Sequence, residues 1–379
     1  MDDLLSVLEK LVAFDTTSRE SNLPMIDWLA DRFDGSADQV IRVPDETGDK
    51  AGLIVRFGPD TAGGIVLSGH TDCVPVDGQV WHTDPFALRR EKDRVHARGA
   101  ADMKGFLAVC TVMAPAFAEA DLDKPLWFAF TYDEEVGTLG APAVVAALEE
   151  VGANPSAVII GEPTLLKVVS AHKGIRSFRV TITGEEGHSS RPGDAANAIA
   201  AGARIATFID DLARSKAAED HPPFEPPYTT FNLAKIHGGT AINIIPNRCV
   251  LDFEYRPVPD DDSMQLRTKI FEFANEEVLP ELQKGFAGAS VEFEDMSVTP
   301  ALAPERNSSA EALVRRICGT DEPTGVVSFG TDGSHFQAAG WSTVVWGPGS
   351  IEVAHRPDEY ITLDQLQACR DGLARLAPT

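Results

Sequence analysis

The sequence predicts an α/β fold with a largely parallel, twisted sheet between helices, interrupted by a second domain of ferredoxin-like α+β type. Short apolar runs alternate with helical patterns in the first third of the chain and again after Pro300. This alternation is typical of a buried parallel sheet that is covered by helices. Between these two regions of the chain the predicted order is strand, helix, strand, strand, helix, strand, which is the split βαβ unit. We therefore expect one discontinuous domain of residues 1–173 and 299–379, with a second domain of residues 174–298 inserted into it.

Hydrophobic periodicity assigns the elements of the discontinuous domain. Branched and aromatic runs predict strands at 52–57, 64–67, 126–131, 157–160 and 342–346. Apolar residues at helical spacing predict helices at 2–13, 25–33, 104–120, 141–151, 308–317 and near 363–376.

The inserted domain is predicted in the same way. Its expected strands are 177–183, 230–236, 249–256 and 291–297, and its expected helices are 195–213 and 263–282. A proline-rich stretch at 221–228 predicts a loop on the surface.

Composition and charge limit the function classes. The 379 residues include 33 Lys and Arg against 58 Asp and Glu, which gives a formal charge of −25, and 43% are hydrophobic. That length and apolar content suit two domains with a sizeable core. A strongly acidic chain lacks the basic surface on which nucleic acids and anionic membranes depend, so we expect no nucleic-acid or membrane partner.

Cysteine usage and the apolar segments indicate a soluble cytoplasmic protein. The five cysteines are scattered, and no CxxC pair occurs, so neither a disulfide framework nor a thiolate zinc site is expected. Asp2 and Asp3 do not suit the basic start of a signal peptide. The longest apolar stretch, Phe106 to Ala118, is too short to cross a bilayer and contains Pro115.

Acidic and imidazole side chains follow three of the predicted strands. His70 and Asp72 come after the run at 64–67, Glu134 and Glu135 after 126–131, and Glu162 after 157–160. Ligands bind beyond the carboxyl ends of the strands in open parallel sheets, so these groups are expected to share one crevice.

Two further residues extend this set. Asp102 lies at the start of the predicted helix 104–120, and His355 lies in a Gly/Pro-rich loop after strand 342–346. Taken alone, Asp102 is explained equally well as the N-cap of a helix, and Glu134 with Glu135 as acids at the start of a helix. Imidazoles combined with carboxylates suit Zn²⁺, with Co²⁺ or Mn²⁺ as alternatives. Because one catalytic metal needs about three protein ligands, this larger set indicates two metals, for which a carboxylate is a suitable bridge.

Seven segments in order along the chain resemble the dinuclear zinc amidohydrolase and peptidase family. They are SGHTDCVPVDGQ, RGAADMKGF, FTYDEEVGTLG, GEPT, GHSSRPGDAANAI, GGTAINIIPNRC and GPGSIEVAHRPDEYI. The family includes acetylornithine deacetylases, succinyl-diaminopimelate desuccinylases, aminoacylases and glutamate-releasing carboxypeptidases. The spacing and sequence of the seven segments are most similar to those of the acetylornithine deacetylases.

The resemblance implies a role for each candidate residue. Two divalent ions, zinc or else cobalt, would be held by His70 and Glu162 for one ion, Glu135 and His355 for the other, and Asp102 between them. Asp72 would accept a hydrogen bond from the His70 imidazole and fix its tautomer. Glu134 would be the general base, and the Asp102–Met103 peptide bond would be cis.

The same resemblance makes the inserted domain a lid and dimerisation domain. His188 would reach into the site of a partner subunit and stabilise the oxyanion. Asn243 and Arg256 would hold the carboxylate of the substrate, a role that suits the bidentate guanidinium. Taken without the resemblance, His188 reads as a polar loop residue and Arg256 as a surface charge.

We therefore expect metal-dependent hydrolysis of an N-acyl amino acid by a homodimer. N²-acetyl-L-ornithine, cleaved to L-ornithine and acetate in arginine biosynthesis, is favoured because its net charge is zero and an acidic protein does not repel it. Succinylated diaminopimelate, other N-acyl amino acids and dipeptides are alternatives on the same scaffold. A binding protein without activity is disfavoured, because it would have lost a ligand or the base, and all of them are present.

Overall fold

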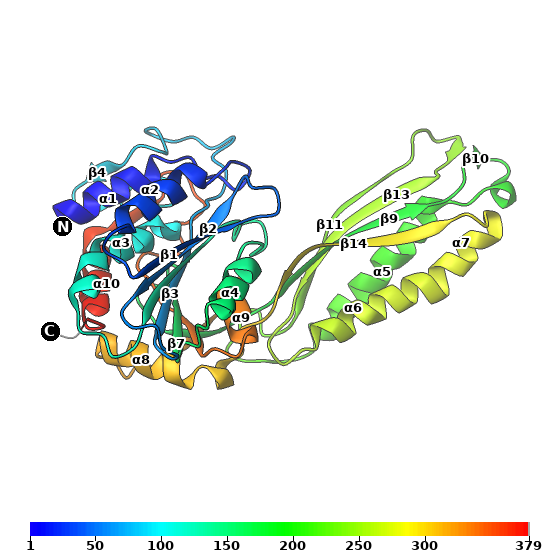
Figure 1. Cartoon of the computed structure of the whole chain (residues 1–379). Helices are drawn as coiled ribbons and strands as arrows, with labels where there is room; N and C mark the ends of the chain where they lie inside the picture. The colour runs from blue at the N-terminus through cyan, green and yellow to red at the C-terminus, as the bar shows by residue number, and fades with distance from the viewer. Residues whose placement is uncertain (378–379) are drawn as a thin grey trace. The chain divides into compact units, whose positions relative to one another are not determined.

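A computed structural model describes residues 1–377, which form two compact units (Figure 1). Unit 1 comprises Met1–Ala171, Leu302–Val326 and the described residues from Thr331 onward. Unit 2 comprises His172–Ala301 together with the short segment Val327–Gly330. That segment joins unit 2 through local contacts, such as the hydrogen bond of 2.6 Å from the Ser328 hydroxyl to the Glu225 carbonyl oxygen.

Unit 1 is built on an eight-stranded mixed sheet. In spatial order its strands are β1 (Gln39–Pro44), β2 (Ala51–Phe57), β6 (Leu126–Thr131), β3 (Ile65–His70), β7 (Ala157–Ile160), β16 (Thr343–Val345), β8 (Val169–His172) and β15 (Gly325–Val327). The central strands β6, β3, β7 and β16 pair in parallel. β1 with β2, β2 with β6, and β16 with β8 pair antiparallel. The parallel order predicted from sequence is therefore confirmed at the centre of the sheet, where the candidate residues lie.

Helices cover both faces of this sheet. They are α1 (Asp2–Val12), α2 (Leu23–Phe33), α3 (Gly105–Glu119), α4 (Ala141–Glu150), α8 (Ser308–Cys318), α9 (Gly333–Ala338) and α10 (Leu363–Ala374). α1, α2, α3, α8 and α10 share one core with alternate strand residues such as Leu67 and Phe128. α4 and α9 contact the sheet from the other face, where Val144 of α4 packs over Gly52.

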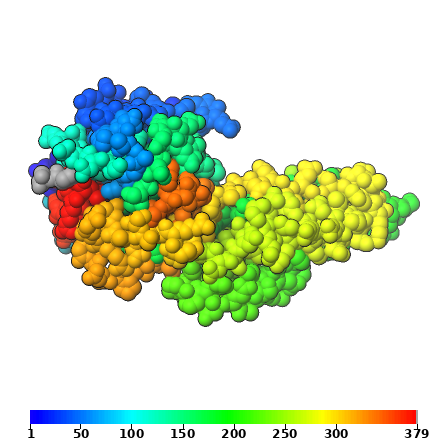
Figure 2. All heavy atoms as spheres, turned by 60° about the horizontal axis from the view of Figure 1, so that its bottom comes forward, coloured from blue at the N-terminus to red at the C-terminus, as the bar shows by residue number. Residues whose placement is uncertain are grey.

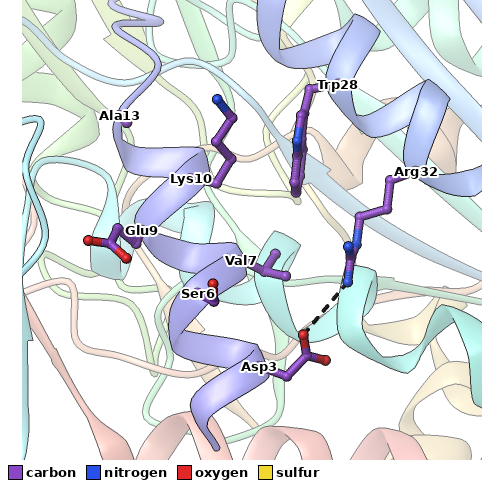
Figure 3. Close-up of a pocket in the computed structure, with 8 residues that line it drawn as sticks. All are labelled: Asp3, Ser6, Val7, Glu9, Lys10, Ala13, Trp28 and Arg32. Carbon is purple, nitrogen blue, oxygen red and sulfur yellow. Dashed lines mark ion pairs between the residues drawn. The ribbon is translucent and has the colours of Figure 1, made fainter.

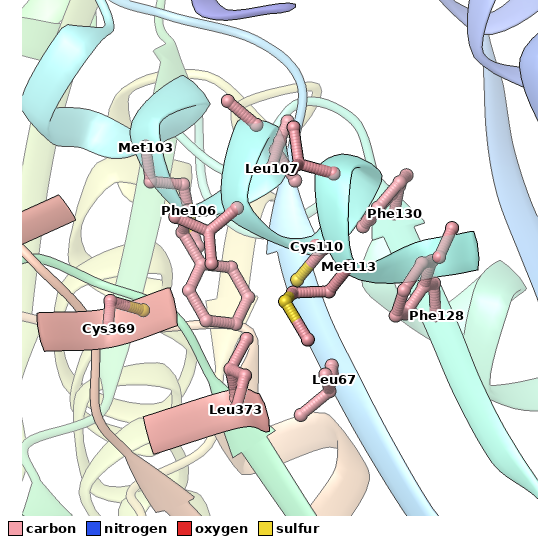
Figure 4. Close-up of a cluster of buried hydrophobic side chains, with 14 of the residues drawn as sticks. Leu67, Met103, Phe106, Leu107, Cys110, Met113, Phe128, Phe130, Cys369 and Leu373 are labelled. Carbon is pink, nitrogen blue, oxygen red and sulfur yellow. The ribbon is translucent and has the colours of Figure 1, made fainter. Parts of the chain in front are cut away.

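α3 is the central helix of this core (Figure 4). Phe106 lies beside Cys369 and Leu373 of α10, and Met113 on the same helix points toward Leu67 of β3. Pro115 does not interrupt the helix, which agrees with the predicted helix at 104–120, because its missing N–H leaves only one helical carbonyl without its usual donor. The stretch Ala100–Glu119 is long and apolar enough to cross a membrane, but 83% of its most apolar window is buried within the protein, as in a core helix.

A small three-stranded sheet lies at the edge of unit 1. It consists of β4 (Arg89–Glu91), β5 (Arg94–His96) and β17 (Tyr360–Thr362), with β5 in the middle. β5 and β17 pair antiparallel, with Tyr360 opposite His96. This pairing joins the segment that leads to Asp102 to the segment that follows His355.

Unit 2 has the strand and helix order predicted from sequence. Its main elements are β9 (Ile175–Thr183), α5 (Ala198–Lys216), β11 (Thr230–Gly238), β13 (Arg248–Arg256), α6 (Ser263–Glu272), α7 (Leu279–Gly285) and β14 (Ser290–Thr299). A π-helical turn at Phe273–Val278 joins α6 to α7, so the two together are the single helix predicted at 263–282. The sheet order β11-β13-β9-β14 is antiparallel throughout, which is the ferredoxin-like arrangement. One face, including Phe178, Phe253 and Tyr255, packs against the helices, whose outer surface is visible in Figure 2.

Candidate metal centre

The carboxyl ends of the parallel strands bring the predicted residues of unit 1 together. His70 is the last residue of β3, Glu162 follows β7, and Glu134 and Glu135 follow β6. The His70 Nε2 atom lies 3.7 Å from Glu162 Oε1. Ligand atoms of His70, Glu134 and Glu162 lie within 4.8 Å of one another, and so do those of His70, Asp102 and Glu135.

Asp102 lies between the two imidazoles. Its Oδ1 atom is 3.0 Å from His70 Nε2, and its Oδ2 atom is 3.3 Å from His355 Nε2. His355 Nε2 also lies 3.0 Å from Glu135 Oε2. One carboxylate thus directs an oxygen to each of two neighbouring groups of ligands, which is the arrangement that a bridging ligand requires.

The backbone around Asp102 is irregular. Gly99 has φ 77°, which favours glycine, and a short π-helical turn follows at Ala100–Lys104. The Asp102–Met103 peptide bond is cis, as the family resemblance implies. Met103 then packs its side chain over Gly69, where a Cβ atom would lie only 2.6 Å from Met103 Cε. The Asp102 loop is therefore packed directly against the end of β3.

Asp72 contacts the His70 imidazole, as expected, but through its main chain more closely than through its carboxylate. The Nδ1 atom of His70 lies 3.0 Å from the Asp72 carbonyl oxygen and 3.4 Å from its carboxylate. The closer partner is therefore the main chain, and donation to it leaves the Nε2 lone pair directed at Asp102. The carboxylate of Asp72 accepts hydrogen bonds from the main-chain N–H groups of Glu134 and Glu135, at 3.1 and 3.2 Å, and from the Ser18 hydroxyl at 2.7 Å.

The carboxylates of this site strongly perturb one another. Burial, followed by repulsion from neighbouring acids, raises the pKa of Glu134 and of Glu162 well above the usual range and that of Glu135 to about 7. Burial also opposes ionisation of Asp102, but hydrogen bonds from His355 and His70 lower its pKa below the usual range. Hydrogen bonds to Asp102 and Glu135 raise the pKa of His355 to about 10.

This donor set fits two divalent cations. The buried Oε1 atom of Glu162 has no hydrogen-bond partner among the described residues. An orphaned buried oxygen is costly unless a cation or proton compensates it. Carboxylates crowded around two imidazoles, without thiolates, are ligands that zinc and related divalent ions accept.

The sequence interpretation missed Arg98 and Glu359, although both lie within quoted segments. The guanidinium of Arg98 and the carboxylate of Glu359 are each 1% exposed and lie 2.6 Å apart. Glu359 also accepts hydrogen bonds from the main chain of the Asp102 loop. Their place in RGAADMKGF and GPGSIEVAHRPDEYI, the segments that also carry Asp102 and His355, is the one sequence signal that could have pointed to this pair.

The other predicted residues belong to unit 2. The Gly187–His188 strand β10 pairs with Ile244–Ile245, which is β12, and the Ser189 N–H donates to the Asn243 carbonyl oxygen at 3.1 Å. His188 and Asn243 are thus neighbours. Arg256 is the last residue of β13, whose first residue, Arg248, is near Asn243 in sequence. At about 3.3 Å per residue the strand separates its two ends by about 26 Å, so unit 2 does not bring Arg256 to the other two.

The tautomer of His188 follows from its neighbours. Its Nδ1 atom lies 3.2 Å from the main-chain nitrogen of Ser190 and 2.8 Å from the Ser190 hydroxyl. A main-chain N–H can only donate, so Nδ1 is the acceptor and the neutral ring carries its proton on Nε2. His188 is exposed, and it therefore presents a hydrogen-bond donor at the surface of unit 2.

A groove between α1 and α2 has different chemistry (Figure 3). Its volume is about 440 Å³, and its walls include Lys10, Trp28 and Arg32. Arg32 forms an ion pair of 3.8 Å with Asp3 and lies over the Trp28 ring. The residues that line the groove include none of the predicted ligands, so the groove is not the candidate site.

The chain belongs to the M20/M25/M40 peptidase family, whose model matches residues 66–379. It is 37% identical over 382 residues to the acetylornithine deacetylase of Myxococcus xanthus, covering 98% of this chain and 96% of that protein. It is 32% identical over 386 residues to the acetylornithine deacetylase of Buchnera aphidicola subsp. Acyrthosiphon pisum (strain Tuc7), with the same coverage.

Solved structures share the fold over the full chain. The M20 family metallo-carboxypeptidase Sso-CP2 from Sulfolobus solfataricus has a TM-score of 0.73 at 17% identity, covering 100% of this chain and 99% of that one. The YXEP protein of Bacillus subtilis, a dinuclear metal-binding peptidase of the M20 family, has a TM-score of 0.66 at 16% identity, covering 99% and 96%. At these identities the likeness establishes the fold alone.

Proposed function

We propose that this protein hydrolyses the amide bond of N-acyl amino acids, with N²-acetyl-L-ornithine as its substrate and L-ornithine and acetate as products. The proposal depends on one observation, the placement of Asp102 between His70 and His355 with Glu134 beside them. The curated relatives that match the whole chain at 32–37% identity support the choice of acetylornithine.

Two divalent ions, zinc or else cobalt, would be held by His70, Asp102, Glu135, Glu162 and His355. When bound, they would lower the pKa of a water molecule and polarise the amide carbonyl.

Glu134 is the proton carrier in this proposal. Burial raises the pKa of this carboxyl group above its usual range, which suits a group that accepts a proton and later releases it. It takes the proton of the attacking water and passes it to the leaving amine, so that the carbon–nitrogen bond breaks as the acid and the amine form. Asp72 orients Glu134 through the main-chain hydrogen bond of 3.1 Å.

Unit 2 would complete the site in a homodimer. His188 would donate its Nε2–H to the oxyanion, while Asn243 and Arg256 would hold the substrate carboxylate. Because the length of β13, about 26 Å, separates Arg256 from Arg248 at the end of the strand that follows Asn243, a small substrate can contact all three only if they come from different chains. Residues 232–238 of the edge strand β11 are exposed, with Ile236 at 52%, and such edges favour pairing across a two-fold axis.

Two wider expectations belong to the same proposal. All five cysteines are free thiols, which supports the reducing environment of the cytoplasm. Release of ornithine would place the reaction in arginine biosynthesis.

The experiment is a profile of amine release from a panel of N-acyl amino acids with added Zn²⁺ or Co²⁺. The panel includes acetylornithine, acetylcitrulline, succinyl-diaminopimelate and dipeptides. We expect the highest kcat/KM for acetylornithine. A higher value for the succinylated substrate or a dipeptide would reassign the substrate within the family, and no hydrolysis of any amide would overturn the proposal.

A further inference from the structure

Two irregular segments carry Asp102 and His355; in the first, the π-helical turn at Ala100–Lys104, Asp102 itself has non-helical backbone angles. The Asp102 loop follows Gly99, and His355 has φ 62°. Neither residue is held by the ladder hydrogen bonds that fix His70 at the end of β3. Buried main-chain donors in such loops need partners from elsewhere in the protein.

Glu359 supplies those partners for the Asp102 loop. Its Oε1 atom accepts from the N–H groups of Ala101 and Asp102, at 2.8 and 3.1 Å, and its Oε2 atom accepts from Gly99 at 3.1 Å. The carboxylate thus satisfies three main-chain donors of one loop, including that of the bridging residue itself. Glu359 is fixed in turn by its place just before β17, which pairs with β5.

Arg98 connects the same carboxylate to the His355 loop. Its Nη1 atom donates to Glu359 Oε2 at 2.6 Å, and its Nη2 atom donates to Gln79 Oε1 at 2.6 Å. Gln79 donates through Nε2 to the carbonyl oxygen of His355 at 2.9 Å. The Trp81 ring lies 5.1 Å from the guanidinium. A continuous chain of hydrogen bonds therefore runs from the main chain of Asp102 to the main chain of His355.

We propose that Arg98 and Glu359 are positioning residues that set the spacing between Asp102 and His355 and thereby the affinity of the site for its metal ions. Neither side chain is a ligand. This inference rests on the proposed metal-dependent function. A buried ion pair contributes little net stability by default, so the role assigned here, the positioning of two metal ligands, is a different one.

Conservative variants test the geometry. In Glu359→Gln the side chain keeps its shape but has one acceptor oxygen, so an NH₂ group must face either Arg98 and Gly99 or the Asp102 loop. In Arg98→Lys the charge remains, but a single ammonium group cannot reach Glu359 and Gln79 together as the fork does. Gln79→Ala, at a half-buried position, removes the link between Arg98 and the His355 carbonyl, together with the acceptor of the Trp81 N–H, and leaves the Arg98–Glu359 pair in place.

The measurement is zinc affinity and stoichiometry of metal-depleted protein in chelator-buffered Zn²⁺, with Tm recorded in parallel. Loss of partners that orient metal ligands weakens metal binding by about 10–100-fold, which we expect for Glu359→Gln and Arg98→Lys, with a smaller effect for Gln79→Ala. Excess Zn²⁺ should restore kcat with KM unchanged. Leu313→Ala, a core truncation on α8, should lower Tm and leave zinc affinity unchanged.

Folded Glu359→Gln and Arg98→Lys proteins with wild-type zinc affinity would overturn the inference and leave the proposed function intact. If neither variant folds, Gln79→Ala decides, and wild-type affinity in that variant has the same consequence. A wild-type protein that binds no metal would overturn the proposed function as well, so the two failures are distinguishable.

Discussion

The main-chain N–H of Glu134 donates to the carboxylate of Asp72 at 3.1 Å. Asp72 also receives the imidazole N–H of His70 on its carbonyl oxygen. A single residue therefore fixes a proposed ligand and the proposed base, which come from different strands. The main-chain N–H of the neighbouring Glu135 donates to the same carboxylate at 3.2 Å. The main chains of the two acids are therefore held in the same way, and their proposed roles differ only through their side chains.

This shared anchoring makes Glu134 and Glu135 a matched pair of variants. Glu134→Gln removes the proton carrier, so kcat should fall by about 10²–10⁴-fold while two zinc ions still bind. Glu135→Gln removes a ligand beside His355, so zinc affinity should fall first and activity should follow the zinc concentration. Steady-state kinetics combined with metal analysis distinguish these outcomes. Near-normal turnover in Glu134→Gln would assign the base to another residue.

Removing the metal should affect both activity and stability. Chelation should abolish hydrolysis, and Zn²⁺ or Co²⁺ should restore it. Because the acids around Asp102 repel one another without a cation, the metal-free protein should also unfold at a lower temperature. An ion that binds only the folded state at 1,000 times its Kd stabilises it by about 4 kcal/mol. Calorimetry with and without zinc measures this shift, and full activity after complete chelation would rule out the mechanism.

The centre of the fold and its site could be predicted from sequence because local pattern and topology agree there. The runs that became β3, β6 and β7 are buried; β3 ends at His70, and candidate residues follow within a few positions of the ends of β6 and β7. Strand direction at the sheet edge could not be predicted in this way, since the run at Ala51–Phe57 is equally apolar but pairs antiparallel. β5 and β17 have only three residues each, too few for a periodic pattern.

The same limit explains why Arg98 and Glu359 were missed. A motif identifies ligands by residue type, whereas this pair acts through main-chain hydrogen bonds that exist only after β5 and β17 have paired. The expectation for Asp72 was inexact for a related reason, because sequence cannot distinguish a carbonyl partner at 3.0 Å from a carboxylate at 3.4 Å.

His335 gives a prediction about pH. Burial lowers its pKa to about 4, and its Nε2 atom lies 2.8 Å from the Thr138 hydroxyl. The unfolded chain binds this proton below about pH 6.5, while the folded chain does so only near pH 4. Between these values the unfolded state carries more protons, so stability falls as the pH is lowered through this range and is full above it.

The corresponding variant is His335→Gln. The difference in free energy of unfolding between wild type and variant should change with pH from 6.5 to 4 by at most about 3 kcal/mol, since each pKa unit corresponds to about 1.4 kcal/mol. Denaturant unfolding of both metal-free proteins measures this difference, in which shared carboxylate titrations cancel. A difference that stays constant over this pH range would contradict the prediction that His335 is neutral in the folded protein.

Arg256 gives a prediction about substrate binding. A guanidinium that holds the substrate carboxylate with two hydrogen bonds contributes mainly to binding. Arg256→Lys should therefore raise KM by about tenfold or more, with zinc content unchanged. Arg179→Lys, at another partly exposed Arg of the same sheet that pairs with Asp252, is the matched control and should leave KM unchanged. Equal effects of the two substitutions would exclude the carboxylate role.

The last prediction concerns His188 and the second subunit. With its Nδ1 accepting from Ser190, the ring offers Nε2–H as a donor. Loss of one oxyanion donor costs about 10²–10³-fold in kcat, which we expect for His188→Ala with zinc content unchanged. The location of the donor is tested by mixing inactive His188→Ala and Glu134→Ala proteins after subunit exchange. If His188 acts in the partner's site, one of the two sites in each mixed dimer has both His188 and Glu134, and activity returns. If exchange is verified by mass and no activity returns, His188 does not act across the dimer.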